Sequence, residues 1–188
     1  MATPGRGTER RSHPDAVVTL RQRTVPEDPE NVDAAVEAAL RVLRGAAQTE
    51  ASLRRRLEFK GWSPAAARAA TAAMTQHGYV DDDAFAQSVA ARRLRGGYGR
   101  ARVASELRAR GVAERPIDDV LRTVGMDDER VSAGRVAERL LERDRTRHGP
   151  DDPRTAERVA GALARRGYDV QTIRHALRTA WGEAPEFG

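Results

Sequence analysis

A short segment occurs three times along the chain, and each copy ends at a glycine. The copies share an apolar pair four residues apart, a cation before the glycine and an apolar residue after it; they read SLRRRLEFKGW, RVASELRARGV and RVAGALARRGY. Apolar residues four apart lie on one helical face, and a cation in the last turn stabilises the negative end of the helix dipole. A left-handed glycine then ends the helix and the next apolar residue packs back, as in a Schellman motif. The copies predict helices ending at Gly61, Gly111 and Gly167.

Each copy lies between two further segments with helical periodicity. Longer helices are expected before the copies, at about 32–44, 82–95 and 127–147. A shorter helix is expected after each glycine, and the first of these begins at the N-cap Ser63 followed by Pro64. The sequence therefore predicts an all-α fold of three tandem three-helix repeats, spanning 32–78, 79–125 and 126–188.

The repeats contain few large apolar residues, which bears on how they assemble. Hydrophobic residues make up 39% of the chain and aromatics 4%, so one repeat has little to bury by itself. We therefore expect an elongated, curved array with cores shared at the junctions, and bends at Gly96-Gly97 and Gly149-Pro150. Residues 1–31 are rich in Pro and Gly and are expected to be a disordered N-terminal tail.

Composition excludes several classes of protein. The chain has no cysteine, so it holds neither disulfides nor a Cys-ligated zinc. No stretch approaches the roughly 18 apolar residues of a membrane span, and the first residues lack the apolar core of a signal peptide. We expect a soluble, cytoplasmic protein, and a monomer because no long apolar stripe is left over.

Positive charge is concentrated in the middle of the chain. Residues 41–110 carry 14 basic and 6 acidic side chains, a net charge of +8, whereas the whole chain carries +5. A glycine-rich turn with one tyrosine lies within a cluster of arginines that we take as the first candidates for contact with DNA or a partner: Arg92, Arg93, Arg95, Arg100 and Arg102. A flexible cationic loop with an aromatic suits phosphates, stacking on unpaired bases, or an acidic protein surface. The alternative for this first set is a group of cations that stabilises the end of a helix and is followed by a linker. Arg54, Arg55 and Lys60 are second candidates, for which a solvated face is the simpler interpretation.

Three carboxylates in a row, Asp81 to Asp83, follow the segment Gly78-Tyr79-Val80. A metal site is one interpretation, but Asp81 is well placed to cap the next helix, with the other two in its first turn. Tyr79 is then expected to close the corner between two helices. The four histidines are scattered, and neither a nucleophile elbow nor a distinctive carboxylate pair is present, so we expect no cofactor, no metal and no enzymatic activity.

A helix-turn-helix repressor or architectural DNA-binding protein is the alternative. Its helix after the turn would need side chains that read bases near its start. Here that helix is mostly alanine in the first repeat, and in the second it begins Glu114-Arg115-Pro116-Ile117-Asp118-Asp119, with carboxylates that phosphates would repel.

From about Leu40 to Trp181 the chain resembles RecX, the family of bacterial regulators of the RecA recombinase. The resemblance is carried by Leu40, Leu43, Thr49-Glu50, Leu53, Leu57 and Lys60-Gly61-Trp62; by Gly78-Tyr79-Val80-Asp81-Asp82 and Phe85-Ala86; and by Gly99, Glu106-Leu107, Arg110-Gly111-Val112 and the weaker Arg165-Arg166-Gly167-Tyr168. The chain departs from the family before the Thr49 cap, where a basic residue is common and this chain has Gly45-Ala46-Ala47-Gln48, and at Ser52, where an acid is common.

The resemblance implies a protein that binds within the groove of the RecA filament on DNA and inhibits it, in DNA repair, recombination and the SOS response. Strand exchange, ATP hydrolysis and coprotease activity would fall. The partners implied are the RecA filament and DNA, the latter as part of the filament or by direct non-specific binding. An array with no catalytic groups, basic at its centre, is suited to such a role through several weak contacts.

Overall fold

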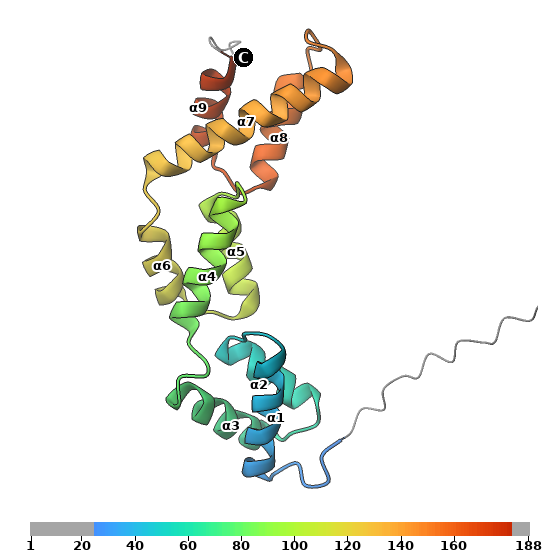
Figure 1. Cartoon of the computed structure of the whole chain (residues 1–188), viewed down its shortest axis with the longest axis vertical. Coiled ribbons are helices and arrows are strands. Elements are labelled where there is room, and N and C mark those ends of the chain that lie inside the picture. The colour runs from blue at the N-terminus through green and yellow to red at the C-terminus, as the bar shows by residue number, and fades with distance from the viewer. Residues whose placement is uncertain (1–24, 182–188) are drawn as a thin grey trace, which may run out of the picture.

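The chain is helical throughout the part that the computed structural model describes, residues 25–181 (Figure 1). These residues form nine helices and no strand: α1 (Val32–Gly45), α2 (Glu50–Phe59), α3 (Pro64–Gln76), α4 (Asp82–Arg95), α5 (Arg100–Arg110), α6 (Glu114–Arg122), α7 (Met126–His148), α8 (Thr155–Arg165) and α9 (Val170–Trp181). They group into three units of three consecutive helices that follow one another along the long axis. The all-α fold of tandem three-helix repeats is confirmed.

The three repeated segments are α2, α5 and α8, and all three end as the sequence predicts. The glycines after them adopt left-handed backbone, with φ of 100° at Gly61, 81° at Gly111 and 85° at Gly167. The amide of the next residue donates back to the last turn in each case, as from Val112 to the carbonyl of Leu107 at 3.1 Å. The residues after the glycines, Trp62, Val112 and Tyr168, are all buried. Each corner is thus a Schellman-type cap that directs the following helix back onto its own unit.

Each unit has a hydrophobic core of its own. The three clusters of buried residues span 35–80, 86–120 and 133–177, with Leu53 and Leu57, Val103 and Leu107, and Val159 and Leu163 at equivalent places. The expectation of cores shared at the junctions is therefore wrong. Alanine explains the difference: Ala35, Ala39 and Ala67 are fully buried, so the helices approach closely and close around few large side chains. Val80, at the start of the second expected repeat, packs in the first core.

The middle helices of the three units join head to tail, in the order α8, α5, α2. At one joint the Gly99 amide, at the start of α5, donates to the carbonyl of Arg166 at the end of α8, at 2.8 Å. At the other, the Thr49 hydroxyl at the start of α2 donates to the carbonyl of Arg110 at the end of α5, at 2.7 Å. Each joint therefore satisfies a carbonyl that the end of a helix would leave unpaired.

Glycine is required at both joints because the backbones approach so closely. A Cβ on Gly111 would lie 2.6 Å from the Cβ of Ala51, and one on Gly167 would lie 2.4 Å from the amide nitrogen of Arg102. A Cβ on Gly99 would meet the Gly167 carbonyl oxygen at 2.4 Å. Hydrogen bonds and close backbone contact thus hold the units together where an apolar core does not.

The glycines expected as bends have other roles. Gly96-Gly97 joins α4 to α5 inside the second unit, and a Cβ on Gly97 would collide with Val136 of the third. Gly149 lies between α7 and α8, inside the third unit. The units are joined elsewhere, by the stretches between α3 and α4 and between α6 and α7. The interpretation of the 92–102 segment as a flexible loop is wrong as well, because most of it belongs to α4 and α5 and both Gly97 and Gly99 pack against the third unit.

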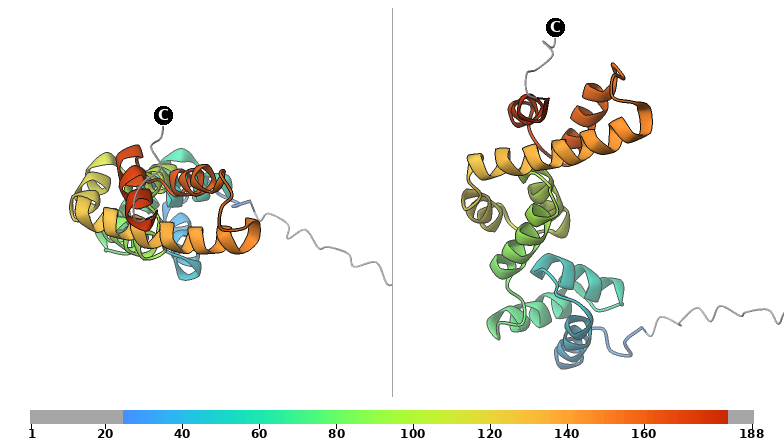
Figure 2. Two further views of the ribbon diagram at one scale, coloured as in Figure 1. Left: turned by 90° about the horizontal axis from the view of Figure 1, so that it is seen from above. Right: turned by 45° about the horizontal axis from the view of Figure 1, so that its top comes forward.

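The long helix α7 lies across the end of α4 and α5 (Figure 2), and both α8 and α9 pack against it. Its first turns extend toward the second unit and carry Glu129, a side chain that is only 7% exposed. The Glu129 carboxylate accepts a hydrogen bond from the Arg100 amide at 2.8 Å and so caps the N-terminus of α5, where Gly99 has no side chain to do so. Helix α5 is therefore held at both ends by neighbouring units.

Residues 1–24 and 182–188 lie outside the described residues, so most of the expected N-terminal tail does too. Residues 25–31 lie against the first unit, where the Ser63 amide donates to the Pro29 carbonyl at 3.0 Å and Asn31 caps α1. Val25 and Pro26 lie next to Gly61. They occupy the position that corresponds to that of Ala51 beside Gly111, at the joint between the first and second units. Among the described helices, none has the length and apolar character needed to cross a membrane.

Candidate nucleic-acid interface

A cleft with two arginines and two aromatics lies between the first and second units. It encloses about 460 Å³ and is formed by the α1–α2 turn, the stretch between α3 and α4, one face of α4 and the end of α5. We call it the junction cleft; its lining residues include Tyr79, Phe85, Arg92 and Arg110. Guanidinium groups beside aromatic rings are the combination that binds the phosphates and stacks on the bases of single strands.

Arg92 and Arg93 share one carboxylate, that of Glu106 on α5. Arg93 donates to Glu106 through Nε, whereas Arg92 is 3.7 Å from it and its side chain is 61% exposed. The hydrogen bond from Arg93, opposed in part by burial, lowers the pKa of Glu106, so this carboxylate is ionised at neutral pH. Arg93 is thereby held in place, and its guanidinium lies over the Tyr98 ring, 5.2 Å from the centroid. Arg92 is the more exposed and more loosely paired of the two, so it is the one that can reach a ligand.

Arg110 completes the cleft, and the sequence reasoning left it out of the candidate set. Its guanidinium lies over the Phe85 ring, 6.0 Å from the centroid, on the exposed end of α5. Arg55 of α2 donates to the Arg110 carbonyl at 3.3 Å, which brings a second-choice candidate to the same joint. The repeat itself could have pointed to Arg110, because Arg110 is the cation that precedes the helix-ending glycine of the second copy.

The other candidate residues are distributed over three places. Arg95 lines a separate hollow with Arg135 and Arg139 of α7. Arg100 and Arg102 lie in the first turn of α5, beside the joint with α8. Lys60 lies at the far end of α2, where it lines a hollow formed by Val25 to Asp28, and Arg54 is half-buried on α2. The structure therefore does not unite the predicted arginines in one loop.

The two tyrosines named from the sequence lie in different places, and only Tyr79 lines the junction cleft. Tyr79 is 62% exposed and does not close the corner; the neighbouring Val80, 3% exposed, does so. The reason is the left-handed Gly78, after which the Tyr79 amide donates to the Met74 carbonyl and the next side chain turns inward. Tyr98 is half-buried, with the Arg93 guanidinium over its ring, and it does not line the junction cleft.

The acidic run before α4 serves as a helix cap. Asp81 accepts from the Ala84 amide at 2.9 Å, and Asp82 accepts from the Glu50 amide of α2 at 2.9 Å. Burial raises the pKa of Asp82, the bond from Glu50 opposing it. Within residues 25–181, no group of three His, Cys, Asp or Glu side chains is arranged to hold a metal ion.

Taken together, the fold and the cleft define a tandem helical-repeat protein whose exposed chemistry is suited to binding a macromolecule. The family model that describes the second three-helix domain of RecX matches residues 81–121. Over 147 residues the chain is 38% identical to "Regulatory protein RecX" of Mycolicibacterium vanbaalenii, covering 75% of this chain and 78% of that one. The protein of the same name from Trichlorobacter lovleyi is 39% identical over 140 residues, covering 73% and 89%.

Solved structures agree on the fold. The crystal structure of RecX from Lactobacillus salivarius superimposes with a TM-score of 0.69 at 15% identity, covering 79% of this chain and 96% of that one. A second crystal structure, that of a regulatory protein RecX, superimposes with a TM-score of 0.66 at 20% identity, covering 76% of this chain and 70% of that one. The chain belongs to the RecX family of regulatory proteins.

Proposed function

We propose that this protein is a negative regulator of RecA that binds in the groove of the RecA filament on DNA. Its binding inhibits strand exchange, ATP hydrolysis and coprotease activity, and the protein itself catalyses no reaction. The resemblance to RecX suggests this role, and the junction cleft is the observation that supports it most directly. A cleft with exposed Arg92, Arg110 and Tyr79 provides a place for the DNA of the filament.

The linear arrangement of the units supports the same role. Three units with separate cores, joined end to end through α2, α5 and α8, present their surfaces along one long molecule. A filament repeats its protomers along an axis, so several weak contacts on an elongated ligand act together. Such a ligand gains affinity from effective concentration, which explains how a small protein acts on a large polymer.

The test is the single-stranded-DNA-dependent ATPase of RecA, measured at saturating DNA so that simple competition for DNA is excluded. We expect the wild-type protein to inhibit. The variant R92E/R110E should need about tenfold more protein for the same inhibition, since two charge-assisted phosphate contacts become repulsions. The control R174E/R178E makes the same change of charge on exposed positions of α9 and should inhibit as the wild type does.

Two results would refute parts of this proposal. An unchanged ATPase with the wild-type protein would remove RecA inhibition as the function. Equal inhibition by R92E/R110E and the wild type would remove the junction cleft from the site. Salt-dependent DNA binding without any effect on the ATPase would instead support the DNA-binding alternative, which the structure favours less because α6 begins with Glu114, ion-paired to Arg108, and exposed Asp118.

A further inference from the structure

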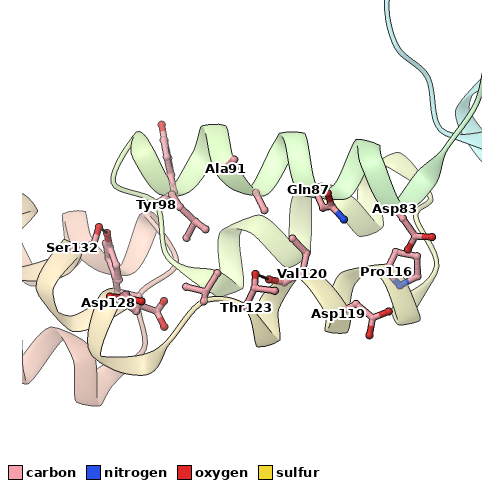
Figure 3. Close-up of a pocket in the computed structure, with 15 residues that line it drawn as sticks. Asp83, Gln87, Ala91, Tyr98, Pro116, Asp119, Val120, Thr123, Asp128 and Ser132 are labelled. Atoms are coloured by element: carbon pink, nitrogen blue, oxygen red, sulfur yellow. Dashed lines mark hydrogen bonds between the residues drawn. The ribbon is translucent and has the colours of Figure 1, made fainter.

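A second depression lies on the side of α4 away from the junction cleft. It encloses about 730 Å³ between α4, α6 and the start of α7, and we call it the α4–α6 groove. Figure 3 shows α4 and α6 as its two walls, with Asp83, Pro116 and Asp119 at one end and Tyr98, Asp128 and Ser132 toward the other.

The two depressions use nearly opposite faces of α4. The cleft takes Phe85, Ser88 and Arg92, whereas the groove takes Gln87, Ala91 and Leu94. At 3.6 residues per turn these two sets of side chains point in nearly opposite directions. A ligand in the groove is therefore separated by α4 from whatever lies in the cleft.

The groove is apolar at its centre and acidic at its ends. Its floor and walls include Ala90, Ala91, Leu94, Tyr98, Val120, Val124 and Tyr168. Of the described residues that line it, four are carboxylates, Asp83, Asp119, Asp128 and Glu129, and none is Lys or Arg. The lining itself is therefore acidic, although exposed Arg115 and Arg122 pair with Asp83 and Asp119 from outside it. A nucleic acid is repelled from such a surface, whereas a segment with basic side chains is attracted.

The dimensions suit a short peptide segment. Along α4 the groove runs from Asp83 to Leu94, a distance of about 16 Å at 1.5 Å per residue. That length accommodates about three turns of a helix or about five extended residues. Carboxylates at both ends and apolar side chains between them match a segment with apolar residues at its centre and Arg or Lys on either side.

We propose that the α4–α6 groove binds a basic, apolar segment of the recombinase, while the junction cleft on the other side of α4 faces the DNA. This rests on the proposed function and deepens it, because it assigns the protein and the nucleic acid of the filament to different faces of one helix. Glu129 caps α5 and lines the groove, so the bound segment also lies next to the joint between the second and third units.

The first experiment exchanges neighbouring charges. The variant D119K/D128K reverses two groove carboxylates, and D118K/D127K reverses the residues directly before them, which are exposed on the same two helices and do not line the groove. Fluorescently labelled protein is titrated with RecA alone and with single-stranded DNA alone. We expect D119K/D128K to bind RecA at least about tenfold more weakly than D118K/D127K, with equal affinity of the two for DNA. Equal affinity for RecA would overturn the proposal.

The second experiment identifies the occupant. A photo-crosslinking amino acid replaces Gln87, an exposed groove residue, and the purified protein is irradiated with RecA filaments. We expect a cross-link to a RecA segment in which Arg or Lys flanks apolar residues. A cross-link to a second copy of this chain, to its own residues 1–24 or to the DNA, or no cross-link to RecA, would overturn the proposal. Inhibition of the ATPase by the wild type alongside any of these results would leave the proposed function intact.

Discussion

Replacing Gly167 by alanine should separate the second and third units, and Gly78→Ala is its matched control. Both glycines have left-handed backbone, with φ of 85° and 72°. An alanine in that conformation costs about 1 kcal/mol at either site. The two sites differ in the room that they leave for a side chain. A Cβ on Gly78 meets nothing within 4 Å, whereas one on Gly167 would lie 2.4 Å from the backbone of Arg102.

The extra cost follows from the contacts that the joint contains. Backbone cannot move aside as a flexible side chain does, so the third unit must withdraw. The bond from the Gly99 amide to Arg166 is then lost, worth about 1 kcal/mol, together with the charge-assisted bond from the Arg100 amide to Glu129, worth about 2 kcal/mol. We expect Gly78→Ala to lower the free energy of unfolding by about 1 kcal/mol and Gly167→Ala by about 4 kcal/mol.

Urea unfolding followed by circular dichroism measures both losses, and small-angle X-ray scattering reports the shape. Gly167→Ala should change the scattering profile under native conditions, because each unit keeps its own core while the joint opens. Gly78→Ala should keep the wild-type profile. Equal losses of stability for the two variants, or an unchanged profile for Gly167→Ala, would refute the conclusion that backbone contact holds these units together.

Three further predictions concern single side chains. Thr49→Val removes the hydroxyl that caps α2 and donates to the Arg110 carbonyl, and should cost about 2 kcal/mol in urea unfolding; a loss below about 0.5 kcal/mol would contradict this. Glu106→Gln removes the carboxylate that Arg92 of the cleft shares with Arg93 and should strengthen RecA inhibition about threefold; weaker inhibition would mean that the placement of Arg92 matters more than its charge. Hydrogen bonds from Arg158 and Thr155 hold the pKa of Asp144 well below its usual range. The stability that this carboxylate contributes is therefore fully present above the ordinary Asp pKa of about 4, and it is lost as the pH falls through the lower pKa of the folded state. Asp144→Asn should therefore lower the melting temperature at pH 7, with a difference from the wild type that narrows below about pH 4; a difference independent of pH would contradict it.

Local features of the fold were predictable because their causes lie within a few residues. The Schellman caps at the three repeat glycines need only a left-handed glycine and apolar residues around it. The same holds for the cap at Asp81 and for α4, which spans the predicted 82–95. The capping box of α2 also forms with Ser52 in place of the usual acid, because its hydroxyl accepts from the Thr49 amide.

The site was predicted only in part, because proximity across units is not a property of one helix. Arg92 was named from its place in a basic run, but its neighbour in the cleft, Arg110, lies at the opposite end of the next helix. Arg93 was named for the same reason and is instead held by Glu106, a residue thirteen positions away. Composition reports how many arginines a segment has, and the packing of α4 on α5 decides which of them are free.

The sequence alone determined that this protein is three copies of one helical unit, because periodicity, caps and left-handed glycines act through hydrogen bonds within one or two turns. Only the tertiary structure decided how the copies join. The contact of Gly99 with Gly167 and of Gly111 with Ala51 depends on two backbones meeting where neither has a side chain in the way. The same contacts orient the second unit between its neighbours. One face of α4 therefore lines the junction cleft with Arg92 and Arg110, and the opposite face lines the acidic groove.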